Sequence, residues 1–334
     1  MARKGTRYAI PRLVSGGIIT NYDCTSRCRH CLYACSPRRP RDAMSEETLR
    51  PLLRTIRSRG CASVHVGGGE PLLRPGRLER VLATVREEGV GVDYVETNAS
   101  WYRGEDEARR ILAGLRRAGL RTLLVSMSPF HNEHIPFSRV KGVLAACRAE
   151  GVGVFPWIQG FYGEIDRFDD RTTHSLEAYE DCYGPGYLAG IPARYWVHPG
   201  GRALSTFSRV WETHPADGIL AGCDGGCAEL LDTSHFHVDL YGRYIPGLCS
   251  GLAVRAEDLG SELDGDRYPL VARLLRDGVA GLAAWARERH GIAPAGRYLN
   301  RCHLCHDIRA RLVRSEGASY EELHPASFYD EAVA

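Results

Sequence analysis

Three cysteines lie close together near the start of the chain, in the pattern Cys24-x3-Cys28-x2-Cys31. Thiolate sulfur is a soft ligand that suits both iron–sulfur clusters and zinc. Three thiolates bind three irons of a [4Fe–4S] cluster and leave the fourth iron open to a small molecule. Cys35 is the one nearby candidate for a fourth ligand. A zinc site is the alternative, with His30 as the ligand that completes it.

A second group of cysteines lies further along the chain, and its members are Cys227, Cys249, Cys302 and Cys305. The segment between the first two reads as a β-hairpin that turns near Gly242. The last two form a Cys-x2-Cys pair, which is typical of metal sites. This group therefore predicts a second metal centre.

Two alternatives remain open for the second group. Cys223 could replace Cys227 as a ligand. A structural zinc ribbon is the other alternative, with His303 or His306 as a spare ligand.

The composition supports metal or redox chemistry. The chain has 12 cysteines in 334 residues, and its N-terminus lacks the apolar segment of a secretory signal. In a reducing compartment such a number indicates metal binding before disulfides, so we expect a cytoplasmic protein. A net charge of +2 predicts neither a nucleic-acid nor a membrane partner. No run of about 18 apolar residues predicts a membrane-spanning helix.

The first 200 residues alternate between strand-like and helix-like segments. Helix signals include Ser45 as an N-cap and Gly60 as a stop. Such alternation predicts a parallel sheet with right-handed crossovers, and an open (β/α)6 partial barrel of the TIM type fits the number of strands. Functional residues should then gather where the strands end. The expected strands are 17–22, 63–66, 90–97, 121–128, 151–159 and 193–198.

This alternation stops near residue 205. Beyond it the chain offers clustered Gly, Asp and Cys, a hairpin and one long helix at about 268–290. We therefore expect an α/β domain over residues 1–205. A small α+β domain over residues 206–334 should follow, held by metal rather than by a large core.

A second motif, Gly68-Gly69-Glu70-Pro71, follows the second expected strand. This motif and the three-cysteine loop, each at the end of its own strand, resemble the radical S-adenosylmethionine (radical SAM) superfamily. The resemblance covers roughly residues 15–205. It implies that the three cysteines bind a [4Fe–4S] cluster whose open iron is chelated by S-adenosylmethionine. It also implies that Gly68, Gly69 and Glu70 meet the methionine amino group of that cofactor.

Further cofactor contacts follow from the same resemblance. His30 occupies the position where the family usually has an aromatic residue that packs on adenine. Polar residues at the ends of the third and fourth strands, and one apolar residue on the fifth, are expected to line the ribose, carboxylate or adenine. These residues are Thr97, Asn98, Ser126, Ser128 and Ile158.

The resemblance also implies a reaction. An electron from a flavodoxin- or ferredoxin-type donor cleaves the sulfonium bond, and the 5′-deoxyadenosyl radical abstracts a hydrogen atom from the substrate. The second cysteine group is similar to the twitch domain, a shortened relative of the SPASM domain. It implies an auxiliary [4Fe–4S] cluster held by Cys227, Cys249, Cys302 and Cys305.

Four residues are candidates for substrate chemistry. Cys182, in a Gly/Pro-rich segment expected to be a loop, would donate a hydrogen atom in an epimerase, and Cys223 is the second candidate donor. His131 and Glu133 would bind a polar substrate or relay a proton. We expect an enzyme that tailors a sugar or aminocyclitol by epimerisation or dehydrogenation. The alternatives are a peptide maturase, which cross-links or epimerises a short peptide, and a non-catalytic zinc or iron–sulfur protein.

Overall fold

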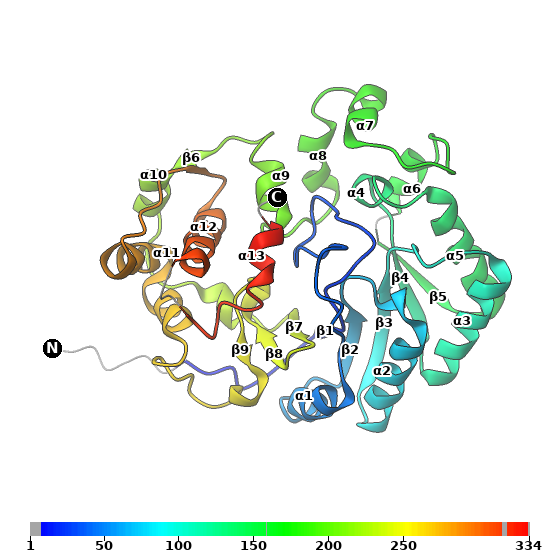
Figure 1. The fold of residues 1–334 in the computed structure, drawn as a ribbon, viewed down its shortest axis with the longest axis horizontal. Helices are drawn as coiled ribbons and strands as arrows, with labels where there is room; N and C mark the ends of the chain where they lie inside the picture. The colour runs from blue at the N-terminus through cyan, green and yellow to red at the C-terminus, as the bar shows by residue number, and fades with distance from the viewer. Residues whose placement is uncertain (1–7, 158, 316–318, 333–334) are drawn as a thin grey trace.

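The computed structural model describes residues 8–157, 159–315 and 319–332. Its centre is an eight-stranded sheet in the order β5-β4-β3-β2-β1-β7-β8-β9 (Figure 1). The first six of these strands are parallel, and the last two are antiparallel. The predicted α/β fold is confirmed. The strands are β1 Gly16–Ile19, β2 Ser63–Gly67, β3 Gly91–Thr97, β4 Thr122–Ser126, β5 Gly153–Trp157, β7 Phe236–Asp239, β8 Arg243–Ile245 and β9 Val254–Arg255.

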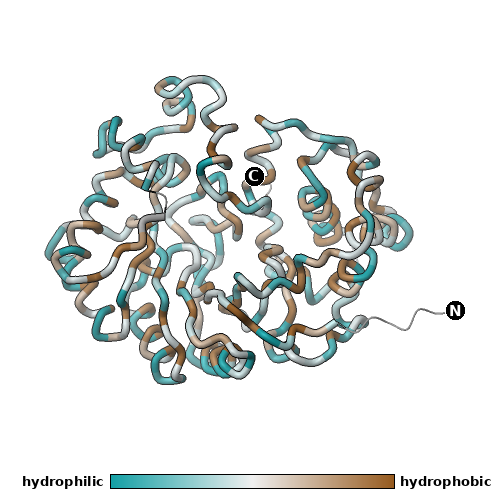
Figure 2. The backbone as a smooth tube through the Cα atoms, turned by 180° about the vertical axis from the view of Figure 1, so that it is seen from behind, coloured by the Kyte–Doolittle hydropathy of each residue, from teal (hydrophilic) through white to brown (hydrophobic). Residues whose placement is uncertain are grey.

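Four helices alternate with the first five strands and pack side by side: α1 Glu46–Ser58, α2 Pro75–Glu87, α3 Glu105–Ala118 and α5 Phe137–Glu150. The first of them begins as predicted, because the Ser45 hydroxyl accepts a hydrogen bond from the Thr48 amide at 3.3 Å. Its buried residues recur at helical spacing: Leu49, Leu52, Leu53 and Ile56. Figure 2 shows hydrophobic segments along the strands and hydrophilic ones in the outer turns.

The sixth strand was expected at residues 193–198, and this prediction is wrong. Helix α8, Tyr187–Arg194, takes up the start of that segment, and residues 195–198 are not in a strand. Tyr187 and Ile191 are one helical turn apart and both are buried, which accounts for the helix up to Arg194. The Tyr-Trp-Val run follows the helix as irregular chain, in which the Tyr195 ring is buried edge-on to His30. A sixth parallel strand comes instead from β7, which pairs with β1.

The predicted hairpin at 235–247 is confirmed as β7 and β8, but it extends the central sheet. The remaining helices gather beyond it and around the cysteine loop (Figure 1). These remaining helices are α4 Pro129–Asn132, α6 Gly160–Ile165, α7 Leu176–Tyr183, α9 Arg202–Phe207, α10 Ala216–Ala221, α11 Pro269–His290, α12 Arg301–Arg314 and α13 Ser327–Ala332. Strands β6 His214–Pro215 and β10 Arg297–Tyr298 form a small second sheet.

Among the described residues, none of the helices has both the length and the apolar character that a membrane crossing requires.

A buried glutamate joins the C-terminal segment to the long helix α11. The Glu322 carboxylate accepts hydrogen bonds from the amides of Leu270 and Val271, in the first turn of that helix. Its own carbonyl accepts from the Ala253 amide at 2.8 Å. Burial raises the pKa of Glu322 to about 8, although the amide donors act in the opposite direction.

Replacing this glutamate should remove a pH dependence of stability. The native state keeps the Glu322 proton between about pH 4.5 and pH 8, where the unfolded state releases it, so stability falls as pH rises through this window. We expect the unfolding free energy of Glu322→Gln to lack this decline, as measured by urea unfolding at matched pH values. Glu321→Gln is the control, because ion pairs lower the pKa of Glu321 to about 2. Parallel pH profiles for the native chain and Glu322→Gln would contradict the expectation.

Candidate active site

The three-cysteine loop follows β1 and lines a cavity of about 690 Å³. This volume lies in the range of small-molecule sites. The ends of β2, β3 and β4 meet the loop there, as parallel strands should. Of the residues predicted from the sequence, the cavity is lined by Cys24, Cys28, Cys31, His30, Gly68, Gly69, Thr97, Asn98, Ser126 and His131.

The glycines after β2 allow close contact with the cysteine loop. A Cβ atom on Gly69 would lie 2.1 Å from the carbonyl oxygen of Asp23, and one on Gly68 would lie 2.7 Å from Oδ1 of Asn21. Because neither glycine has a Cβ atom, the Gly69 amide can approach the Asn21 carbonyl and donates a hydrogen bond to it at 2.7 Å. The two loops are therefore held backbone to backbone beside the cavity.

Glu70, the third residue of the motif, is placed differently from the expectation. Its carboxylate is fully buried and accepts hydrogen bonds from the Asn98 amide at 2.6 Å, the Leu72 amide at 3.0 Å and the Thr97 hydroxyl at 3.0 Å. Burial raises the pKa of Glu70 to about 7, and these donors oppose the shift. The side chain ties the end of β2 to the end of β3, so only Gly68 and Gly69 of the motif line the cavity.

Asn98 orients the cysteine loop from the end of β3. Its Nδ2 atom lies 3.4 Å from Cys24 Sγ, 3.3 Å from Thr25 Oγ1 and 3.2 Å from Ser26 Oγ. Its Oδ1 atom accepts from the Ser100 amide at 2.9 Å, which fixes the rotation of the amide group. A donor directed at the sulfur stabilises thiolate charge and holds a metal ligand in place.

A buried arginine, which the sequence did not indicate, holds the other side of the loop. Arg202, at the start of α9, is 2 % exposed and donates from Nε to the Cys28 carbonyl at 2.9 Å and from Nη2 to the Cys35 carbonyl at 2.7 Å. Gly201 permits this approach, because a Cβ there would lie 2.3 Å from the Cys31 carbonyl oxygen and its φ is +55°. The third guanidinium nitrogen, Nη1, is buried without a hydrogen-bond partner among the described residues.

Cys24 and Cys28 of the loop lie in an environment that disfavours free charge, whereas Cys31 does not. Burial raises the pKa of Cys24 to about 12 and raises that of Cys28 well above its usual value, while Arg202 lowers both. A hydrogen bond with Cys35 lowers the pKa of Cys31. Buried thiols of this kind become thiolates when a metal replaces their protons.

His30 packs against three aromatic side chains beside the loop. Its ring stacks on Phe130 with centroids 4.6 Å apart, and it meets His131 and Tyr195 edge-on. His131 Nδ1 in turn lies 2.7 Å from the hydroxyl of Ser128. Ser128 is therefore buried behind His131 rather than exposed to the cavity.

Glu133 and Cys182, like Glu70 and Ser128, are not among the residues that line this cavity. Glu133 forms an ion pair with Arg29 at 2.9 Å. Cys182 lies in the last turn of α7 rather than in a loop, and it is exposed and absent from the cavity lining. Ile158 lies outside the described residues.

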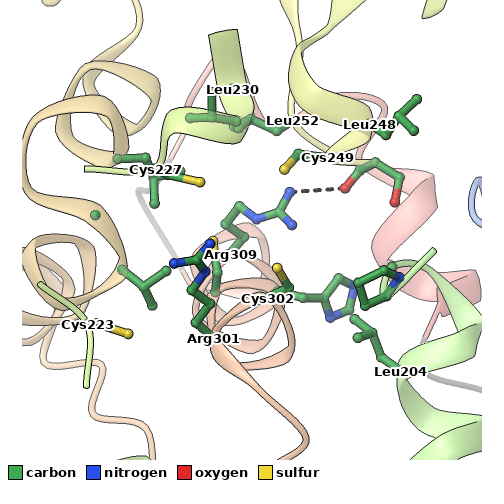
Figure 3. Close-up of a pocket in the computed structure, with 18 of the residues that line it drawn as sticks. Leu204, Cys223, Cys227, Leu230, Leu248, Cys249, Leu252, Arg301, Cys302 and Arg309 are labelled. Atoms are coloured by element: carbon green, nitrogen blue, oxygen red, sulfur yellow. Dashed lines mark hydrogen bonds between the residues drawn. The ribbon is translucent and has the colours of Figure 1, made fainter. Parts of the chain in front are cut away.

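The second cysteine group lines its own cavity, as Figure 3 shows. Arg309 donates to the Ser250 carbonyl at 3.0 Å, and its Nε atom, like Nε2 of His306, is buried without a partner among the described residues. His198 and Leu248 line both this cavity and the first one. The cysteines of this cavity are Cys223, Cys227, Cys249, Cys302 and Cys305.

The sulfurs of the two cysteine groups are spaced more widely than the ligands of a single zinc ion. A tetrahedral zinc site, with Zn–S bonds of about 2.3 Å, needs sulfurs about 3.8 Å apart. Across the described part of the chain, neither cysteine group offers three ligand atoms that all lie within 4.8 Å of one another. A [4Fe–4S] cluster, which is larger than an ion, needs the wider separation.

A family comparison agrees with the site. The family model of the radical SAM superfamily matches residues 18–166. Residues 18–166 form a radical SAM superfamily domain. The superfamily implies a [4Fe–4S] cluster and S-adenosylmethionine, and the three cysteines, the two glycines and the unpartnered Nη1 of Arg202 fit these groups. The cysteine motif and Gly68-Gly69-Glu70 both lie inside the radical SAM domain.

Solved structures were also compared with the chain. Native anSMEcpe with bound AdoMet shares 13% identity over 95% of this chain and 95% of that one, with a TM-score of 0.43. Streptococcus suis SuiB bound to S-adenosylmethionine shares 12% identity over 81% and 67%, with a TM-score of 0.34. The match to native anSMEcpe with bound AdoMet and Cp18Cys peptide shares 18% identity, spans 42% of this chain and only 41% of that one, and has a TM-score of 0.33. No curated protein matches the chain.

Replacing the buried arginine should weaken the radical SAM domain. Arg202→Met leaves the Cys28 and Cys35 carbonyls without their donors, which costs about 2–6 kcal/mol of unfolding free energy. We expect this loss in chemical denaturation, together with less iron bound by the purified protein. Arg209→Met, which removes an exposed arginine just after the end of α9, is the control. Equal stability of the two variants would refute the role assigned to Arg202.

Proposed function

We propose that this protein is a radical SAM enzyme that dehydrogenates a polar, sugar-like small molecule. Cys24, Cys28 and Cys31 would hold a [4Fe–4S] cluster, and the backbone of Gly68 and Gly69 would receive the methionine end of S-adenosylmethionine. When bound and reduced, the cluster supplies the electron that cleaves the carbon–sulfur bond of this cofactor. A flavodoxin- or ferredoxin-type protein would be the electron donor.

The auxiliary cluster belongs to the same proposal. Cys227, Cys249, Cys302 and Cys305 would hold a second [4Fe–4S] cluster in a twitch-like domain, with Cys223 as a spare ligand. Figure 3 shows Arg309 among these sulfurs, where its charge would offset that of the cluster, whereas the nearby Arg301 is already paired with Glu229. The buried Nε of Arg309 has no hydrogen-bond partner among the described residues, which supports a negatively charged occupant.

The main support for dehydrogenation is the wall that the two cavities share. Because His198 and Leu248 line both, a substrate in the first cavity would lie one side-chain layer from the auxiliary cluster. That arrangement suits removal of an electron from the substrate. One hydrogen atom would leave a hydroxyl-bearing carbon and become part of 5′-deoxyadenosine. One electron would pass to the auxiliary cluster and the hydroxyl proton to a base, so that the alcohol becomes a ketone.

Residues of this chain would serve that step. His131 lines the cavity, and the Ser128 hydroxyl fixes its ring, so we assign it the role of accepting the proton. Epimerisation receives less support, because the expected hydrogen donor Cys182 lies outside the cavity. The proposal therefore favours dehydrogenation over epimerisation.

The cavity wall suggests the class of substrate. Tyr33, Tyr94, Phe155 and Trp196 line the cavity, and rings of this kind pack against the apolar faces of sugars. Phe155 and Trp196 are 47 % and 57 % exposed, so they lie where a substrate would enter. A short peptide that inserts one side chain is the second substrate class to be tried.

Loss of any cysteine of the three-cysteine loop should abolish cleavage of S-adenosylmethionine. We expect Cys24→Ala, Cys28→Ala and Cys31→Ala, each reconstituted without oxygen, to form no 5′-deoxyadenosine with dithionite, because three thiolates are needed to hold the cluster. Liquid chromatography measures the product. Cys61→Ala, which removes a buried cysteine outside both cavities, is the control and should keep the activity. Cleavage by a variant of the three-cysteine loop would overturn the proposal.

Loss of Cys302 and Cys305 should abolish oxidation of the substrate but leave cleavage of S-adenosylmethionine intact. In Cys302→Ala/Cys305→Ala we expect bound iron to fall from about eight to about four atoms per chain. 5′-Deoxyadenosine should still form, but the ketone should not accumulate because the electron acceptor is missing. Cys182→Ala should leave the product unchanged. A ketone made at the native rate without these two cysteines would exclude the auxiliary cluster from the reaction.

A further inference from the structure

Three histidines converge on the inner face of the sheet. His65 lies on β2, His237 lies on β7, and His235 directly precedes β7. One ligand atom from each lies within 4.8 Å of the others, and across the described residues no other group of three meets this criterion. The Nε2 atoms of His65 and His237 are 2.9 Å apart. The sequence analysis assigned no role to any of them.

A glycine in the intervening strand allows the rings to meet. Strand β1 runs between β2 and β7, and Gly17 is the register partner of both His65 and His237. A Cβ atom on Gly17 would lie 2.1 Å from Nε2 of His65. The two imidazoles therefore reach each other across a position that only glycine leaves empty.

Neighbouring groups hold the rings in place. The Tyr33 hydroxyl lies 2.8 Å from Nδ1 of His237, and the His65 ring hydrogen-bonds the backbone of Gly16. The His65 ring stacks with Tyr94 at 5.0 Å and with His235 at 5.1 Å. Such outer contacts, which leave the Nε2 atoms directed inward, are the supports that histidine metal ligands usually have.

The charge state also suits a cation. Burial lowers the pKa of His65 to about 3 and lowers the pKa values of His235 and His237, so all three rings are neutral at physiological pH. Neutral imidazole is the form that binds metals. An oxygen of Glu96 lies 4.0 Å from Nε2 of His65, in space that opens because Gly67 has no side chain.

We propose that His65, His235 and His237 bind a divalent transition metal ion of the zinc class in the wall of the substrate cavity. Nitrogens bound tetrahedrally at about 2.0–2.1 Å lie about 3.4 Å apart. Here two of the nitrogens are 2.9 Å apart, and all three ligand atoms lie within 4.8 Å of one another, so small movements of the rings would reach that spacing. His235, His237 and Glu96 line the cavity, so the fourth position of the ion faces it. A hydroxyl or carboxylate oxygen of a substrate is the ligand class that this position would take.

The inference is separate from the iron–sulfur chemistry, and its test reads metal content rather than activity. The full chain is first reconstituted with iron and sulfide so that its thiols are occupied, then given Zn²⁺ and desalted. We expect about one zinc per chain by mass spectrometry. Zinc K-edge absorption should show nitrogen and oxygen neighbours with imidazole scattering, and no sulfur.

Variants decide whether the histidines are responsible. His65→Ala and His235→Ala should each lower bound zinc at least tenfold while iron stays unchanged, because two imidazoles bind the ion far more weakly than three. His290→Ala, whose ring instead contacts Tyr320, is the matched control and should keep the zinc. If His65→Ala fails to fold, the half-exposed His235 decides the question.

Two results would overturn the inference. Zinc with sulfur neighbours would assign the ion to a cysteine group. Equal zinc in His235→Ala and the native chain, or no zinc in either, would leave the histidines as a hydrogen-bonded chain from Tyr33 to the backbone of Gly16. Neither result would affect cofactor cleavage, so failure here is distinguishable from failure of the proposed function.

Discussion

The position of β1 is the constraint on which the rest of the structure depends. This four-residue strand is fully buried and pairs in parallel with β2 on one side and β7 on the other. Its carboxyl end releases the cysteine loop at the centre of the sheet, beside the glycines that follow β2. Its glycines leave room for two imidazoles from the flanking strands. Because β7 belongs to the C-terminal part of the chain, the same strand also joins that part to the radical SAM domain.

Burial decides the chemistry available around this strand. Burial suppresses ionisation of the Cys24 and Cys28 thiols, and Arg202 supplies a positive charge whose hydrogen-bond acceptors are two neutral backbone carbonyls. An uncompensated buried charge is costly, so such a cation implies an anionic partner. The second cysteine cavity repeats the principle with Arg309. In both places a buried arginine and clustered sulfur occur together, and no ion pair of Arg202 or Arg309 is found among the described residues.

Local sequence patterns predicted the parts of the site that are contiguous in the chain. The three-cysteine spacing and the Gly-Gly-Glu segment each lie within a few residues, and strand ends could be located from hydrophobic alternation. Arg202 was missed because it reaches the loop from about 170 residues away and no periodic signal marks such a contact. His65 and His237 were missed for the same reason, although Gly17, at the start of the strand predicted at 17–22, was a signal of close approach. The strand expected at 193–198 was wrong because helix α8 extends to Arg194 and the following residues, which form no strand, place Tyr195 against His30. Cys182 was placed in a loop because the adjacent glycines and proline obscured the end of α7.

The wall formed by His198 and Leu248 links two properties that enzymes often vary independently. A smaller side chain at Leu248 would enlarge the first cavity and, in the same change, admit water toward the sulfurs of the second. Hydration and hydrogen bonding at sulfur set the reduction potential of a cluster. A mutation that admits bulkier molecules would therefore also change the reduction potential of the proposed auxiliary cluster. Homologues that accept larger compounds should carry compensating changes around Arg309.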